Sequence, residues 1–139
     1  MPHDLSALPT WILSAAASRS HQVIQQRLAQ AGVNGYQYRC LTALAAAAQL
    51  SQTELGAAAS LDGRDVTHTV RALEDRGLVL RVKDPSHGRR QLVSLSPEGR
   101  EVADALGRVM AEVQEEVFHG LSRDERSTLL RLLERVARA

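Results

Sequence analysis

The sequence predicts a mainly α-helical chain with one small β-hairpin, arranged as a winged helix-turn-helix with N- and C-terminal dimerisation helices. Three observations predict this fold. Two short helical stretches are joined by a three-residue turn, a hairpin pattern of period 2 follows them directly, and longer helical stretches flank this unit on both sides. We expect an N-terminal helix in residues 1–34, the winged unit in residues 35–96, and the C-terminal helices in residues 97–139.

The first helix is expected over residues 9–31, where a proline suits the first helical position. Apolar residues then recur at intervals of three and four along one face, and a glycine ends the helix. A second helix is expected over residues 35–48. Asn34 and Gln37 are spaced as a capping pair at its start.

Two short helices with N-terminal caps form the predicted helix-turn-helix. Ser51 and Glu54 have the spacing of a capping box and open a helix over residues 52–59. Asp62 caps a further helix over residues 63–76, and only three residues connect the two. This short connection is typical of a helix-turn-helix.

The hydrophobic period changes from 3.6 to 2 directly after the second of these helices. In the first strand Leu78, Leu80 and Val82 alternate with Val79, Arg81 and Lys83, as in a half-buried strand. Residues 84–88 are rich in turn formers, and residues 91–95 read as the returning strand. The hairpin therefore has a basic tip and follows the helix-turn-helix as a wing.

Two helices are expected at the C-terminal end. Ser96 caps a long helix over residues 97–118, and Ser122 with Glu125 opens the last helix. The last helix carries an apolar stripe formed by Leu129, Leu132, Leu133 and Val136. A small domain has no obvious way to bury this stripe together with those of the first and the long helix, so we expect a homodimer.

Composition excludes several classes of protein. The chain has 139 residues, of which 44% are apolar and 3% aromatic, so a globular core is expected but a platform for stacking single-stranded bases is not. One cysteine excludes a disulfide framework and a cysteine-based zinc site. The five histidines lie on separate elements, so no metal set and no cofactor is expected. No long apolar run or signal peptide stands in the sequence, and we expect a cytoplasmic protein without membrane contact.

The near balance of 17 basic and 16 acidic residues hides a strong asymmetry. Residues 76–90 contain five basic residues and one acid, whereas residues 101–119 contain five acids and one arginine. A local basic patch indicates an anionic partner, although two solvated faces would give the same count. No glycine-rich phosphate loop, nucleophile motif or paired carboxylates support an enzyme.

A series of short motifs between Leu50 and Gly99 has a specific order and spacing. The motifs are Glu54-Leu55, Leu61-Asp62, Val66-Thr67, Leu73-Glu74, Arg76-Gly77-Leu78-Val79, Asp84-Pro85, Gly88-Arg89 and Val93-Ser94-Leu95-Ser96-Pro97-Glu98-Gly99. Together they resemble the MarR family of bacterial transcriptional regulators, over essentially the whole chain. The resemblance implies a homodimer that binds pseudo-palindromic double-stranded DNA. It also implies repression that is relieved by a small phenolic or anionic effector.

Two positions depart from the family pattern. His87 stands where the wing usually carries an acid two residues before its arginine, which puts an acid–arginine clamp in doubt. Arg64 and Asp65 stand where the recognition helix usually carries small hydroxyl residues. The second departure suggests a different operator sequence.

The candidate DNA-binding residues lie on the second helix of the helix-turn-helix and on the wing. On the helix they are Arg64, Asp65, Thr67, His68 and Arg71, and on the wing they are Lys83, Arg89 and Arg90. Such a helix enters the major groove, and an arginine at a hairpin tip suits a narrow minor groove. The alternatives are a solvated helix face, with Asp65 acting only as the capping partner of Asp62, and a solvated turn residue at Arg89.

The resemblance places an effector pocket where the first, second and long C-terminal helices meet the winged unit. Trp11, His21, Tyr36 and Arg39 are the polar or amphipathic candidates, although His21 would also suit an interface between subunits. Cys40 is a candidate redox sensor or a buried inert thiol. The remaining alternative is a dimeric winged-helix protein that binds other proteins and no specific DNA.

Overall fold

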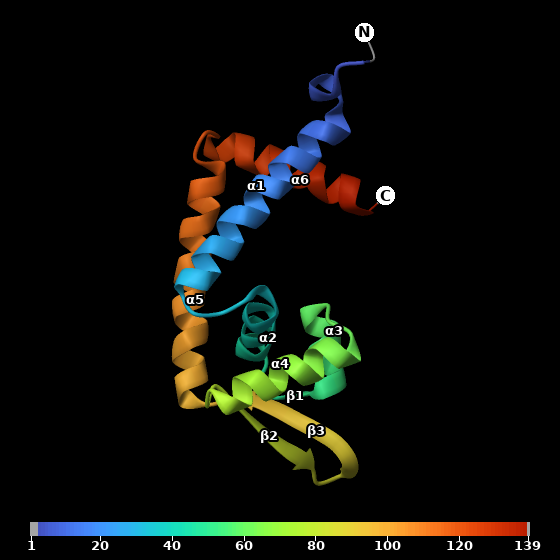
Figure 1. Cartoon of the computed structure of the whole chain (residues 1–139), viewed down its shortest axis with the longest axis vertical. Coiled ribbons are helices and arrows are strands. Elements are labelled where there is room, and N and C mark those ends of the chain that lie inside the picture. Colours follow the sequence, from blue (N-terminus) through green and yellow to red (C-terminus); the bar gives the residue numbers. More distant parts are fainter. Residues whose placement is uncertain (1–2, 139) are drawn as a thin grey trace.

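The structure is a computed structural model that describes residues 3–138, and its helices and strands follow the predicted order (Figure 1). The elements are a 3₁₀ helix η1 (Leu5–Ala7), α1 (Pro9–Gln30), α2 (Gly35–Ala46), β1 (Leu50–Ser51), α3 (Gln52–Ala59), α4 (Gly63–Asp75), β2 (Val79–Asp84), β3 (His87–Leu95), α5 (Pro97–Phe118) and α6 (Arg123–Arg138). No helix among these residues is long and apolar enough to cross a lipid bilayer.

The molecule is elongated, with the winged unit at one end and both chain termini at the other (Figure 1). The long helix α5 starts beside the sheet and leads away from it, and α1 packs against α5. An ion pair between Arg27 of α1 and Glu112 of α5 joins the two helices. The helix α6 then turns back across the far end.

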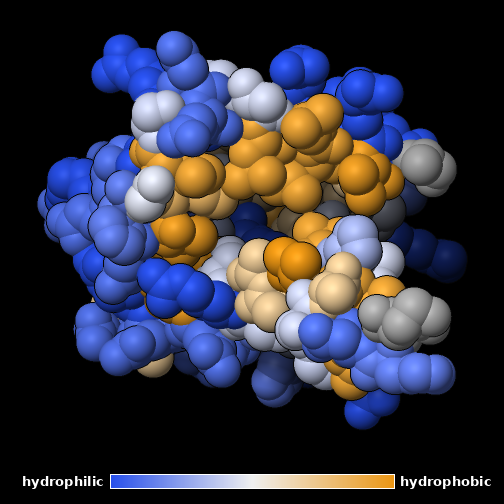
Figure 2. All heavy atoms as spheres, turned by 90° about the horizontal axis from the view of Figure 1, so that it is seen from above, coloured by the Kyte–Doolittle hydropathy of each residue, from blue (hydrophilic) through white to orange (hydrophobic). Residues whose placement is uncertain are grey.

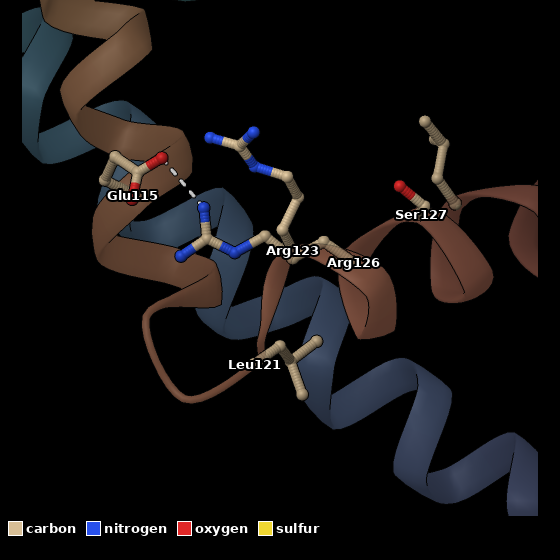
Figure 3. Close-up of a pocket in the computed structure, with 6 residues that line it drawn as sticks. Glu115, Leu121, Arg123, Arg126 and Ser127 are labelled. Carbon is tan, nitrogen blue, oxygen red and sulfur yellow. Dashed lines mark hydrogen bonds and ion pairs between the residues drawn. The ribbon is translucent and has the colours of Figure 1, made fainter.

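The turn between α5 and α6 is held by Arg126. Its guanidinium donates to Glu115 Oε1 at 2.8 Å (Figure 3). It also donates to the carbonyl oxygen of Phe118 at 3.2 Å. The hydrogen bond from Arg126, together with its positive charge, lowers the pKa of the Glu115 carboxyl below its usual range. The contacts border a hollow of about 430 Å³ and fix the direction in which α6 leaves the turn.

The predicted caps are present at the starts of five helices, α2 to α6. Asn34 with Gln37, Ser51 with Glu54 and Ser122 with Glu125 all form reciprocal capping boxes. The buried Ser96 hydroxyl accepts from the Gly99 N–H at 3.0 Å and donates to the Gly77 carbonyl oxygen at 2.6 Å. Ser96 therefore fastens the start of α5 to the turn that precedes the wing.

The sheet has the strand order β1-β3-β2 and is antiparallel throughout. β2 and β3 form the predicted hairpin, but its turn is only Pro85-Ser86, and β3 begins at His87 rather than at residue 91. The two-residue strand β1, which pairs with Val93 and Leu92, has no counterpart in the sequence prediction. A strand of two residues is too short to show a period.

The sequence predicts the wrong buried face for β2. Val79 is buried, whereas Leu80 and Val82 are 54% and 53% exposed. Arg81 takes the inner side opposite Val93, and its guanidinium reaches Glu74 of α4 at 3.0 Å. This ion pair lets the charged side chain of Arg81 lie on the inner face of the sheet, where the alternation predicts only apolar residues.

The core lies between α2, α3, α4 and the sheet and continues along α5 and the end of α1. Its fully buried aliphatic side chains include Leu28, Leu41, Leu44, Leu55, Leu73, Val70, Val79, Val93 and Leu106. By contrast, every residue of α1 before Ser20 is exposed. The core therefore stabilises the winged unit and leaves the other end of the molecule uncovered.

Candidate nucleic-acid interface

The helix α4 presents three basic side chains to solvent on the face opposite the core. Val66, Val70 and Leu73 are buried, whereas Arg64, His68 and Arg71 are exposed. The exposed residues border a surface hollow of about 700 Å³ together with Asp62, Asp65 and Thr67. The predicted residues of this helix therefore lie on one surface, which is the arrangement that groove binding requires.

Asp62, and not Asp65, provides the side chain that caps α4. Asp62 Oδ1 accepts from the Asp65 backbone N–H at 2.8 Å. Asp65 contributes only its main chain to this cap. Its half-buried carboxylate therefore needs a different explanation from the capping role considered above.

Thr67 is half-buried and already hydrogen-bonded within the protein, which corrects its assignment to the exposed face. Its hydroxyl donates to the Gly63 carbonyl oxygen at 2.7 Å and accepts from Gln52 Nε2 of α3 at 2.8 Å. Gln52 was not among the predicted residues. No sequence pattern indicates this contact, because it depends on how α3 and α4 cross.

The wing places Lys83 and Arg89 in solvent beside a rigid turn. The buried carboxylate of Asp84 accepts from the Ser86 hydroxyl and backbone N–H, and these bonds lower its pKa below the usual range. Arg89 lies in β3 rather than in the turn. The register passes from Lys83 opposite Gln91 to Asp84 opposite His87, so Arg89 belongs to a bulge without partners on β2.

Arg90 is held within the protein, unlike Arg89. Its Nη2 lies 3.1 Å from Glu54 Oε1 and its Nε lies 3.9 Å from Asp84 Oδ2, and the side chain is 44% exposed. Glu54 is the capping residue of α3, and its pKa is lowered first by the Ser51 backbone N–H and then by the Ser51 hydroxyl and Arg90. Arg90, which is predicted to contact phosphate, thus forms an ion pair between the wing and α3 in the free protein.

A cavity of about 700 Å³ lies between α1, α2 and α5. It is lined by His21, Tyr36 and Arg39 together with Gln25, Asn34 and the apolar side chains of Ile24, Leu28 and Met110. The Arg39 guanidinium stands over the Tyr36 ring, 5.2 Å from its centroid, as in a cation–π pair. Three of the four predicted effector residues are thus brought together.

Trp11 does not line this cavity. It lies ten residues before His21, about 15 Å along α1, and is 51% exposed. Its neighbours in the exposed segment are Leu8 and Ile12. The structure places Trp11 on the uncovered end of the molecule rather than at the cavity.

Cys40 lies fully buried on α2, beneath the surface that carries Arg39. Burial raises the pKa of its thiol to about 11, and the nearby Arg39 only partly opposes this effect. A thiol that stays protonated and covered is a poor nucleophile. This environment fits a structural cysteine. Across residues 3–138, no three His, Cys, Asp or Glu side chains are grouped to hold a metal ion.

Comparison with known proteins identifies the family. Residues 31–90 match the model of the MarR family. PcaV, a transcriptional regulator from Streptomyces coelicolor solved with its natural ligand, is 31% identical with a TM-score of 0.81, over 100% of this chain and 98% of PcaV. The chain belongs to the MarR family. It is a transcriptional regulator with a DNA-binding winged helix, not an enzyme.

Two further MarR-family relatives are similar over nearly the whole chain. One is BpsR of Bordetella bronchiseptica, whose DNA binding is regulated by 6-hydroxynicotinic acid. It is 25% identical with a TM-score of 0.85, and the match spans 100% of this chain and 99% of the BpsR chain. The transcriptional repressor NicR of Pseudomonas putida is 27% identical over 97% of this chain and 85% of NicR. The order of elements predicted from the sequence is therefore that of the family.

Proposed function

We propose that this MarR-family regulator is a homodimeric repressor that binds a pseudo-palindromic DNA site and leaves it when an anionic aromatic ligand binds. One observation carries the DNA-binding part. Arg64 and Arg71 on α4 and Arg89 on the wing are exposed and form no ion pair with the residues of 3–138. These free guanidinium groups suit phosphates and guanine edges.

The uncovered apolar end supports the homodimer. Its exposed side chains are Leu5, Leu8, Trp11, Ile12 and Leu13 near the N-terminus and Leu130, Leu132, Leu133 and Val136 on α6. Figure 2, which views the molecule from this end, shows a broad hydrophobic area there. A patch of this kind marks an interface, and a second copy of the chain would cover it by two-fold symmetry. Such a dimer carries two α4 helices for two half-sites.

The cavity between α1, α2 and α5 supports an effector. Arg39 offers a cation to a carboxylate, and Tyr36 and His21 offer flat rings and polar atoms. Both α1, which leads into the uncovered end, and α2, which packs in the winged unit, contribute to its wall. A ligand that prefers one relative position of these helices would change the spacing of the two α4 helices.

Selection from randomised duplex DNA tests the DNA-binding proposal. The enriched sequence should be an inverted repeat with half-sites about one helical turn apart. Affinity for it should fall steeply with salt, and Arg64→Ala or Arg71→Ala should weaken it. If no sequence is enriched and the little binding observed is insensitive to salt, the chain is a protein-interaction module instead.

Calorimetry with 6-hydroxynicotinic acid and a panel of hydroxybenzoates tests the effector. A ligand of this class should bind the wild-type protein and release the selected duplex. Arg39→Ala should weaken that binding about tenfold or more, because it removes a charge-assisted hydrogen bond. Arg108→Ala on the exposed part of α5 is the matched control. Equal affinities for the Arg39 variant and the control would refute the assignment of the cavity.

A further inference from the structure

The helices α3 and α4 meet beside Gly56, where an added Cβ would stand 3.1 Å from the Leu61 carbonyl oxygen and 3.5 Å from Val66 Cγ1. A hollow of about 310 Å³ lies at the same crossing and is lined by these three residues together with Gln52, Thr53, Gly63 and Thr67. Apolar packing is therefore incomplete at this crossing, and a directed contact is needed to fix the angle between the two helices.

A chain of two hydrogen bonds joins the two helices beside this hollow. Gln52 Nε2 donates to Thr67 Oγ1 at 2.8 Å, and the Thr67 hydroxyl donates onward to the Gly63 carbonyl oxygen at 2.7 Å. Both bonds run in the same direction, so each strengthens the other. The chain ends at Gly63, the first residue of α4 and the neighbour of Arg64 in sequence, and it passes through Thr67, the neighbour of His68.

Stability alone does not explain an amide side chain at Gln52. Its Oε1 atom is buried and has no hydrogen-bond partner among residues 3–138. A buried polar atom without a partner destabilises the folded state, and an apolar side chain of the same length would avoid that cost. The benefit of an amide here is the directed contact with Thr67.

We propose that Gln52 is a positioning residue that sets the angle of α4 and thereby the sequence discrimination of the protein, without touching DNA itself. Thr67 transmits this effect and does not read a base. The inference rests on the proposed DNA-binding function and extends it to a residue of α3. It predicts that removal of the Gln52–Thr67 contact changes discrimination between duplexes more than it changes stability.

Gln52→Met keeps the length of the side chain and removes the hydrogen bond, and Thr67→Val removes its partner. Three quantities are measured: the melting temperature, the deuterium exchange of the backbone amides of residues 63–67, and the affinity ratio between the selected duplex and a shuffled one. We expect each variant to speed exchange and to lower the ratio about three- to tenfold, the equivalent of one hydrogen bond. The double variant should be no worse than either single variant, and Gln114→Met on exposed α5 should behave as wild type.

Three results would overturn the inference. The first is unchanged exchange and an unchanged affinity ratio in Gln52→Met. The second is additive losses in the double variant, which would show that the two residues act independently. The third is a changed base preference at one position in Thr67→Val but not in Gln52→Met, which would show that Thr67 reads a base.

A different result separates this inference from the function on which it rests. If the wild-type protein selects no DNA sequence, the proposed function fails. The positioning role is then decided by exchange alone: faster exchange in Gln52→Met with an unchanged melting temperature supports it, and unchanged exchange overturns it.

Discussion

Gly99, in the first turn of α5, is the position where a single methyl group should be most damaging. A Cβ built on Gly99 would lie 1.9 Å from the carbonyl oxygen of Leu78 and 2.9 Å from its carbonyl carbon. Both are backbone atoms, so no side chain can rotate out of the way. The same Leu78 oxygen accepts the Ser96 N–H at 3.0 Å. Gly99→Ala must therefore move α5 away from the start of β2.

The size of the effect follows from what this movement breaks. Overpacking costs about 1–3 kcal/mol, and the bonds from Ser96 to Leu78 and Gly77 contribute about 1 kcal/mol each. The higher helix propensity of alanine offsets about 0.5–1 kcal/mol of this loss of stability. We expect a net loss of about 2–4 kcal/mol, which for a chain of this size lowers the melting temperature by roughly 10 °C or more.

Gly107 supplies a matched control in the same helix. Nothing lies within 4 Å of a Cβ built there, and the residue is exposed. Gly107→Ala should therefore raise the free energy of unfolding by about 0.5–1 kcal/mol. Urea denaturation of both variants, with the m-value compared to detect a changed denatured state, measures the difference. Two variants that change stability equally, or a Gly99→Ala protein as stable as wild type, would refute the reasoning.

Four further predictions follow from the same contacts. Arg89→Ala should weaken binding to the selected duplex by about 1–3 kcal/mol and lower the salt dependence of binding by about one ion. Arg90→Ala should weaken binding less, because Arg90 is paired with Glu54 within the protein. Equal losses of affinity for the two variants in salt titrations would contradict this. Burial raises the pKa of the Cys40 thiol from 9.0 to about 11. The contribution of the protonated thiol to the free energy of unfolding is therefore complete below about pH 9 and is lost between about pH 9 and 11. Cys40→Ala should abolish that part of the pH dependence in urea titrations. Removal of residues 122–139 should leave an insoluble or unfolded chain, and a well-folded monomer in sedimentation would contradict the dimer. Asp65→Ala should keep the melting temperature and lose one base preference in a repeated selection if Asp65 reads cytosine; a large fall in melting temperature would show a structural role.

The features predicted from the sequence depend on residues close together in the chain. The capping boxes of Ser51 with Glu54 and of Ser122 with Glu125 join positions three apart, and the structure confirms both. The hydrophobic period of α4 likewise places Val66 and Val70 in the core without reference to any other element. Local spacing therefore predicts helix starts and the faces of amphipathic helices.

Three errors concern contacts between different elements rather than the local pattern of one element. Arg81 lies on the inner face of β2 because Glu74 of α4 is there to pair with it, and alternation alone gives the opposite face. Thr67 is half-buried because Gln52 of α3 reaches it. Trp11 lies on the same helix as His21 but too far along α1 to reach the cavity, which α2 and α5 complete beside His21. In each case the answer depends on where a second element packs.

The near-zero net charge of the chain is compatible with DNA binding because the charges are separated along its length. The acidic residues Glu112 and Glu115 pair with Arg27 and Arg126 at the far end of α5. Glu115 stands 18 residues after Pro97, about 27 Å along the helix and away from the sheet. The Debye length at physiological salt is about 8 Å, so these carboxylates do not offset the potential around α4 and the wing. Only local charge acts on a bound duplex, and there the exposed guanidinium groups prevail.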